Sequence, residues 1–159
     1  MEYYCDKLNF KFQVPNNDFA PITDEGKVKI FNMDEDQLKL NLFIFFELKN
    51  SRPTGRYFQI VADPGTYSNK EELEKGQDLS RDNIKKFFPE LEQISEFDLM
   101  PQNIRKCVWK RPDGSLMSQY YMGVNNKYMI CVSGDISAED DDLDTLMANI
   151  CFSVSSPRN

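Results

Sequence analysis

The sequence predicts an α+β protein in which an antiparallel β-sheet of five to seven strands carries helices packed on its faces. Three observations predict this class. Stretches that alternate apolar and polar residues recur along the chain, pairs of turn-forming residues separate several of them, and two stretches show the apolar periodicity of helices. The chain of 159 residues fits one domain, so residues 1–159 are assigned to a single α+β domain.

The first half of the chain is predicted to supply most of the early strands. The stretch LNFKFQV alternates apolar and polar residues and stops at Pro15. The run LKLNLFIFFELK alternates first and then becomes apolar on both faces, which is typical of a central strand covered on both sides. An acidic turn, NMDEDQ, precedes this run, and RPTG follows it as a second turn. The expected strands are 8–14, 27–31, 38–49 and 56–62.

Residues 69–92 are predicted to be one helical region. Ser68 and Glu71 have the spacing of a capping box, which marks a helix start. Gly76 is expected to break the region, and Pro89 is expected to end or kink it.

Three further strands, 104–111, 115–124 and 127–134, are predicted to form a meander. Asp113-Gly114 and Asn125-Asn126 are signals for two-residue hairpin turns. With both turns of that length, six side chains share the sheet face that a helix covers: Cys107, Trp109, Tyr120, Met122, Met129 and Cys131. Four of them, Trp109, Tyr120, Met122 and Met129, are our candidate for a partner-binding surface.

The stretch DISAEDDDLDTL allows three interpretations: a metal-binding loop, an acidic surface that attracts a basic partner, or the charged start of a helix. A calcium loop starting at Asp140 would need Gly at its sixth position and a carboxylate at its twelfth, but Thr145 and Cys151 stand there. As a helix start, Ser137 serves as the N-cap and the acidic residues occupy the first turn, where the helix dipole favours anions. We therefore predict a helix near 138–150 and no metal site.

The composition excludes several kinds of catalytic mechanism and of ligand-binding site. The chain has no His, which excludes His-based nucleophile activation and His-ligated metal centres, and it has no Gly-rich phosphate loop. No catalytic or cofactor-binding residues are predicted. The net charge of −7 disfavours nucleic acids and anionic membranes as partners.

The four cysteines show no metal-binding spacing, and no leader or bilayer-spanning stretch is visible at the level of sequence. Reduced thiols and a cytoplasmic location are expected. On the predicted register, Cys107 and Cys131 lie two strands apart, roughly 9–10 Å, which is too far for a disulfide.

The order of these elements, with LNFKFQVP near the start and KYMICVSGDISAEDDDLDTLMANICFSV at the end, resembles the PsbP-like and DcrB-like sandwich superfamily. That superfamily includes a photosystem II extrinsic subunit, a Ran-binding import factor, and bacterial lipoproteins and effector chaperones. The resemblance implies an antiparallel sheet between helices and a role in binding proteins. The aromatic residue that often follows the opening Pro in this superfamily is replaced here by the stretch PNNDF.

The expected function is therefore a non-enzymatic protein-binding domain, in an adaptor, chaperone or immunity-like role. The alternative is a small-molecule-binding protein or a small enzyme, with a pocket between the sheet and the 69–92 helix. A purely structural, oligomeric role is a third reading.

Overall fold

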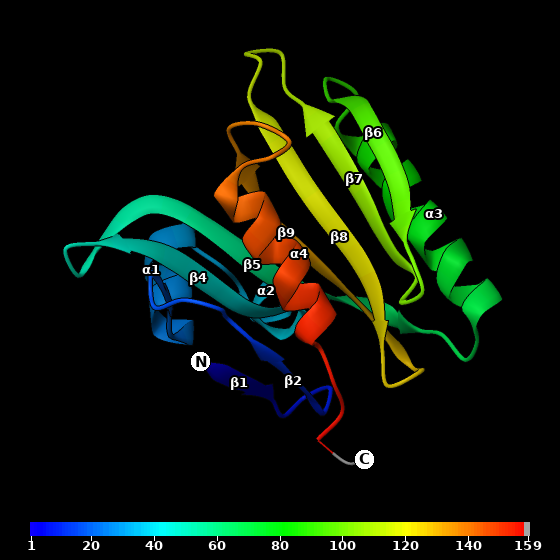
Figure 1. Ribbon diagram of the computed structural model, residues 1–159, viewed down its shortest axis with the longest axis horizontal. Helices are drawn as coiled ribbons and strands as arrows, with labels where there is room; N and C mark the ends of the chain where they lie inside the picture. Colours follow the sequence, from blue (N-terminus) through cyan, green and yellow to red (C-terminus); the bar gives the residue numbers. More distant parts are fainter. Residues whose placement is uncertain (158–159) are drawn as a thin grey trace.

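The structure is a computed structural model that describes residues 1–157 (Figure 1). Within these residues, seven strands form an antiparallel sheet with helices on both faces, and β1 (Glu2–Cys5) pairs separately with β2 (Phe10–Gln13). The predicted α+β class and its antiparallel sheet are confirmed. The sheet contains, in spatial order, β3 (Phe19–Pro21), β4 (Asn41–Lys49), β5 (Arg52–Thr66), β9 (Tyr128–Ile136), β8 (Leu116–Val124), β7 (Ile104–Lys110) and β6 (Glu92–Leu99).

One face of the sheet is covered by α4 (Asp142–Ser153), which lies in front of the sheet in Figure 1, together with β1 and β2. The apolar stripe of α4 is buried here, including Leu143, Met147 and Ile150. Aromatic rings fill the space beside it, and the rings of Phe45 and Phe58 stack with centroids 4.9 Å apart. This face holds the larger hydrophobic core.

The opposite face carries α1 (Asp24–Phe31), α2 (Glu35–Leu40) and α3 (Lys70–Phe87). Phe31 at the end of α1 packs on Phe46 and Tyr57, with ring centroids 6.0 and 5.4 Å away. On α3, Gln77 donates through its Nε2 to the main-chain oxygen of Tyr121 on β8, 3.1 Å away. The two groups of helices therefore rest on different strands of the same face.

The predicted strand at 27–31 was wrong, because these residues belong to α1. The Thr23 hydroxyl accepts a hydrogen bond from the Gly26 N–H at 3.1 Å and caps the helix, and Asn32 ends it in the left-handed conformation with φ 53°. The pattern KVKIF was too short to separate a strand from a helical turn. Similarly, the acidic turn before the long run is the start of α2, with Asp34 as its N-cap.

The predicted break at Gly76 was also wrong, because α3 runs unbroken past it. Its N-cap is Asn69, whereas the Ser68 hydroxyl donates to the Glu72 carboxylate at 2.9 Å. The absence of a Cβ at Gly76 lets the Tyr67 ring lie directly against the helix. Of the helices in residues 1–157, none is long and apolar enough to cross a membrane.

Candidate functional site

The four side chains predicted as a partner-binding surface lie on two different faces of the sheet. Trp109 and Met129 face α3 and are 0% and 1% exposed, whereas Tyr120 and Met122 face α4 and are 1% and 5% exposed. The prediction that they share one face was wrong. All four belong to the two cores and form no exposed surface in this structure.

The error lies in the two hairpin turns. Val124 pairs with Tyr128, so residues 125–127 form a three-residue loop rather than a two-residue turn. At the other hairpin, the main-chain N–H of Arg111 donates to the oxygen of Ser115 at 2.8 Å, which again leaves three residues in the loop. Each additional loop residue shifts the pairing of β8 with the neighbouring strand by one residue. Such a shift changes which side chains of β8 share a sheet face with those of β7 and β9.

The acidic stretch is the start of α4, as predicted, but Asp141 and not Ser137 is the N-cap. Asp141 accepts from the main-chain N–H of Leu143 at 2.7 Å and of Ser137 at 2.9 Å, and it pairs with Arg56. The helix begins at Asp142 instead of near residue 138. No group of three metal-ligating side chains occurs in the part of the chain that the structure describes.

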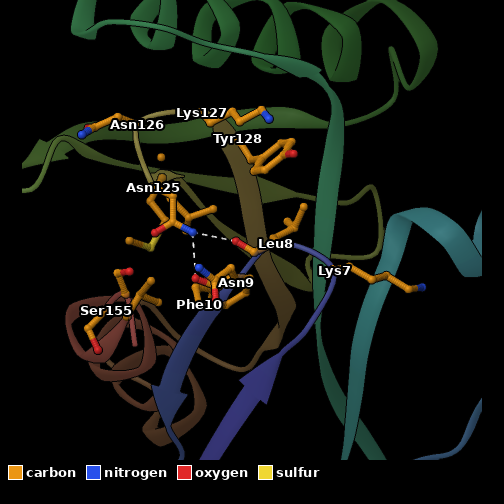
Figure 2. A pocket seen from close by; sticks show the side chains of 14 residues that line it. Lys7, Leu8, Asn9, Phe10, Asn125, Asn126, Lys127, Tyr128 and Ser155 are labelled. Carbon is orange, nitrogen blue, oxygen red and sulfur yellow. Dashed lines mark hydrogen bonds between the residues drawn. The ribbon is translucent and has the colours of Figure 1, made fainter. Parts of the chain in front are cut away.

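A hollow of about 730 Å³ lies at the tip of the β8–β9 hairpin (Figure 2). Asn125 closes one side of it, because its Nδ2 donates to the main-chain oxygens of Leu8 and Asn9 at 2.6 and 2.8 Å. In Figure 2 the ammonium ends of Lys7 and Lys127 lie well apart from each other. The hollow thus lies between the hairpin and the β1–β2 loop, and the two lysines that line it do not converge on one point.

A second feature is a groove along the flank of α3, over the middle of the sheet. It consists of two adjoining hollows of about 380 and 390 Å³. Four residues line both hollows: Gln59, Ile84, Gln119 and Ser133. We call this feature the α3 groove. It occupies the place where the sequence had suggested a pocket, between the sheet and the 69–92 helix.

The floor of the α3 groove is a row of three polar side chains from neighbouring strands. Gln59 of β5 is in register with Ser133 of β9, and Ser133 is in register with Gln119 of β8. The small serine therefore lies between two long amide side chains. Gln59 donates through Nε2 to the Ser133 hydroxyl at 3.4 Å, a long and weak contact.

The walls of the groove combine partly exposed apolar side chains with polar and charged ones, among them Asp63, Glu90 and Arg111. Of the apolar residues, Ile84 comes from α3, Phe88 is the C-cap residue after α3, and Leu40 is the last residue of α2. Phe88 is 49% exposed and Leu40 is 36% exposed. Exposed apolar side chains beside a hollow with polar groups on its floor are typical of a binding groove.

The ionisable groups on the floor remain neutral near pH 7. Burial, with a further contribution from the neighbouring Cys107, raises the pKa of the Cys131 thiol to about 12. Burial likewise raises the pKa of the Tyr121 hydroxyl well above its usual range. The floor therefore offers hydrogen bonds without charge, and neither group is suited to act as a base or a nucleophile at neutral pH.

Sequence reasoning missed the floor residues. Each is a polar residue within a strand of mostly apolar residues, in the stretches YFQIVA, LMSQYYM and MICVSG, and Gln119 follows a second polar residue, Ser118. A polar residue at a buried position of a strand is the signal that could have found each one. Their alignment into a row depends on the strand register, which the hairpin signals predicted incorrectly.

Neither a scan against protein-family models nor a search of curated proteins gives a match to this chain. Among solved structures, the chain is similar to the solution structure of cyanobacterial PsbP (CyanoP) from Synechocystis sp. PCC 6803. The TM-score is 0.64 at 12% sequence identity, and the match covers 98% of this chain and 91% of that chain. At this identity the likeness concerns the fold alone, and the chain therefore has a PsbP-like fold.

Proposed function

We propose that the protein is a non-enzymatic binding domain that holds a segment of a partner protein in the α3 groove. The observation that carries the proposal is the in-register row of Gln59, Ser133 and Gln119 at the base of a groove that exposed apolar side chains flank. Polar side chains on a covered sheet face cost desolvation free energy unless they gain hydrogen bonds. A row of them at the base of an open groove supports a role in recognition.

The shape of the groove favours a polypeptide over a small molecule. Small ligands usually bury 70–90% of their surface in an enclosing pocket. The α3 groove instead runs along α3 past Ile84 and Phe88, with exposed apolar side chains beside it. A polypeptide segment can lie along such a groove with its other side covered by the rest of the partner.

The partner segment is expected to be apolar and the partner not to be a nucleic acid. The floor is uncharged near pH 7, and the chain carries a net charge of −7. Within residues 1–157 all four cysteines are free thiols, which supports a cytoplasmic setting for this binding.

A small neutral metabolite is the second candidate, because each hollow lies within the range of about 300–1,000 Å³ found for small-molecule pockets. An enzyme would need an acid, base or nucleophile at the floor. The raised pKa values of Cys131 and Tyr121 weigh against that role.

The test is a selection of random linear peptides displayed on phage against the wild-type protein. Ile84→Arg places a long charged side chain in the groove, and Leu79→Arg makes the same kind of change at a site on the same helix that is 61% exposed and lines neither hollow. Selected peptides should bind the wild type and Leu79→Arg and should lose binding to Ile84→Arg. Thermal melts check that both variants are folded.

The position of binding is read from the backbone amide NMR signals of Gln59, Gln119 and Ser133, which selected peptides should shift. Failure to enrich any peptide, or equal binding to Ile84→Arg, would refute the proposal. A parallel screen with a library of small uncharged fragments distinguishes the second candidate. Fragments that shift these three signals, in the absence of peptide binding, would establish the small-molecule reading instead.

A further inference from the structure

The geometry points to a specific mode of recognition in the α3 groove: an extended segment lies along β9, and Gln119 donates a hydrogen bond to one of its main-chain carbonyls. This inference rests on the proposed function and adds which chemical groups of the bound segment the groove recognises. It predicts that the floor recognises the main chain of the segment, while the apolar side chains of the walls contact its side chains.

The orientation of the Gln119 amide is fixed by its neighbours. Its Oε1 accepts the indole N–H of Trp109 at 2.8 Å and the hydroxyl of Tyr121 at 2.8 Å. An indole N–H can only donate, so the amide oxygen must face Trp109. The Nε2 group consequently points the other way, and it donates to no residue among those that the structure describes.

Gln119 is 8% exposed and lines both hollows, so its free N–H₂ group is a donor held in place at the groove. Because this donor opens onto the groove, water can serve as its acceptor in the free protein. A carbonyl oxygen from a bound segment would replace that water as the acceptor. Trp109 and Tyr121, which hold the amide, act as positioning residues.

Ser133, beside Gln119, can accept from the N–H of a peptide group. Its hydroxyl accepts from Gln59 at 3.4 Å, and Gln59 in turn accepts from Asn41 at 3.1 Å. A hydroxyl has one donor and two acceptor sites, so with its donor directed to Cys131 the Ser133 hydroxyl retains one acceptor site toward a ligand. A main-chain peptide group offers one donor and one acceptor, which complements this pair.

The width of the floor favours an extended segment over a helix. Gln59 and Gln119 lie on either side of β9, and two strand spacings separate their Cα atoms by about 9–10 Å. An α-helix with its side chains is about 10–12 Å across, before the two glutamine side chains are allowed for. A single extended strand fits between them, over the small side chains of Cys131 and Ser133.

Gln119→Glu tests the donor directly. One oxygen of the new carboxylate still accepts from Trp109 and Tyr121, so the fold is retained. The atom at the former Nε2 position, which points into the groove, is then an acceptor instead of a donor. A peptide selected on the wild type should bind this variant about tenfold more weakly at neutral pH, which corresponds to about 1.4 kcal/mol. Gln102→Glu makes the same chemical change at an exposed residue that lines neither hollow of the groove, and it should leave affinity unchanged.

Replacing each main-chain amide of the selected peptide by an ester weakens one carbonyl acceptor and removes the N–H donor of the same amide; the loss of the N–H affects binding to the wild type and to Gln119→Glu alike. One ester should reduce affinity more for the wild type than for Gln119→Glu, because the two changes remove the same hydrogen bond. Peptides that depend on Ile84 but bind Gln119→Glu normally, or that bind as helices by NMR, would overturn this inference and leave the proposed function intact. An absence of groove-dependent peptides would refute both.

Discussion

Lys106 of β7 and Asp144 in the first turn of α4 form a buried ion pair, with 2.6 Å between Nζ and Oδ2 and with side chains only 11% and 3% exposed. The other carboxylate oxygen accepts from the hydroxyls of Ser118 at 2.8 Å and Tyr120 at 2.6 Å. The Lys106 ammonium also lies 5.5 Å from the centre of the Tyr120 ring. The carboxylate thus joins α4 to two strands of the sheet through three donors.

Removing the carboxylate should destabilise the protein strongly. Asp144→Ala leaves the Lys106 ammonium buried without a counter-charge, and breaking a buried pair from one side costs about 3–5 kcal/mol. Urea unfolding followed by circular dichroism measures the loss. A loss below about 1 kcal/mol, the value of an exposed pair, would contradict the buried geometry.

The matched control removes both charges. In the double variant Lys106→Met with Asp144→Leu, no buried charge remains, and replacing a buried ion pair by apolar residues of similar volume is often close to neutral. The double variant should therefore be more stable than Asp144→Ala. If the free-energy changes of the single variants Lys106→Met and Asp144→Leu simply add up to that of the double variant, the two side chains do not interact.

Asp141 should contribute more to α4 than Ser137, the residue that the sequence had suggested as the cap. Asp141→Ala removes acceptors for Leu143 and Ser137 and should cost about 1–2 kcal/mol, in the upper part of the range for N-caps. Ser137→Ala removes only a hydroxyl donor and should cost about 0.5–1.5 kcal/mol. Thermal unfolding compares the two, and a larger loss for Ser137→Ala would contradict the assignment.

The contribution of Asp141 should depend on pH. Burial raises its pKa, but hydrogen bonds from Ser137, Leu143 and Arg56 outweigh burial and hold the pKa well below its usual range. A group with a lowered folded pKa stabilises fully above its unfolded value of about 3.9 and loses this contribution as pH falls further. The stability difference between wild type and Asp141→Ala should therefore shrink below about pH 4. A difference that is constant from pH 6 to pH 2 would contradict this account.

The buried thiols should limit stability at alkaline pH. Burial raises the pKa of Cys107 to about 12, with a further contribution from Glu96, and the pKa of Cys131 is also raised to about 12. An unfolded thiol ionises near pH 8.5, so the stability from keeping these thiols neutral is full below that pH and is lost as pH rises toward the folded pKa. Urea unfolding should show stability falling above about pH 8.5, and falling less steeply in Cys107→Ala.

The sequence predicted the strands of the meander but not their faces, for a reason that the hairpin at Asn125 illustrates. Asn125-Asn126 favours a two-residue turn locally, yet the Asn125 side chain donates to the main chain of Leu8 and Asn9. Such a contact with the far end of the chain is invisible in a local pattern. One additional loop residue then reverses which side chains of β8 face α3.

The place of the candidate site was predictable in part, because the alternative reading placed a pocket against the 69–92 helix, where the α3 groove lies. The preference for a binding protein over an enzyme, which came from the absence of His and of phosphate loops, stays a prediction. The row of Gln59, Ser133 and Gln119 was not predictable, because it joins β5, β9 and β8 and exists only in the correct register. Long-range pairing, and not local propensity, assembles the candidate site.

The final prediction concerns Gly76, where local propensity and tertiary packing disagree. In an isolated helix, Gly→Ala gains about 1 kcal/mol. Here an added Cβ would lie 2.4 Å from the Tyr67 ring, so Gly76→Ala should instead cost about 1–3 kcal/mol through overpacking. In a Tyr67→Ala background the ring is gone, and the same change should become stabilising. Urea unfolding of the four proteins decides the matter: a gain from Gly76→Ala in the presence of Tyr67 would show that the ring does not pack on α3 at this position.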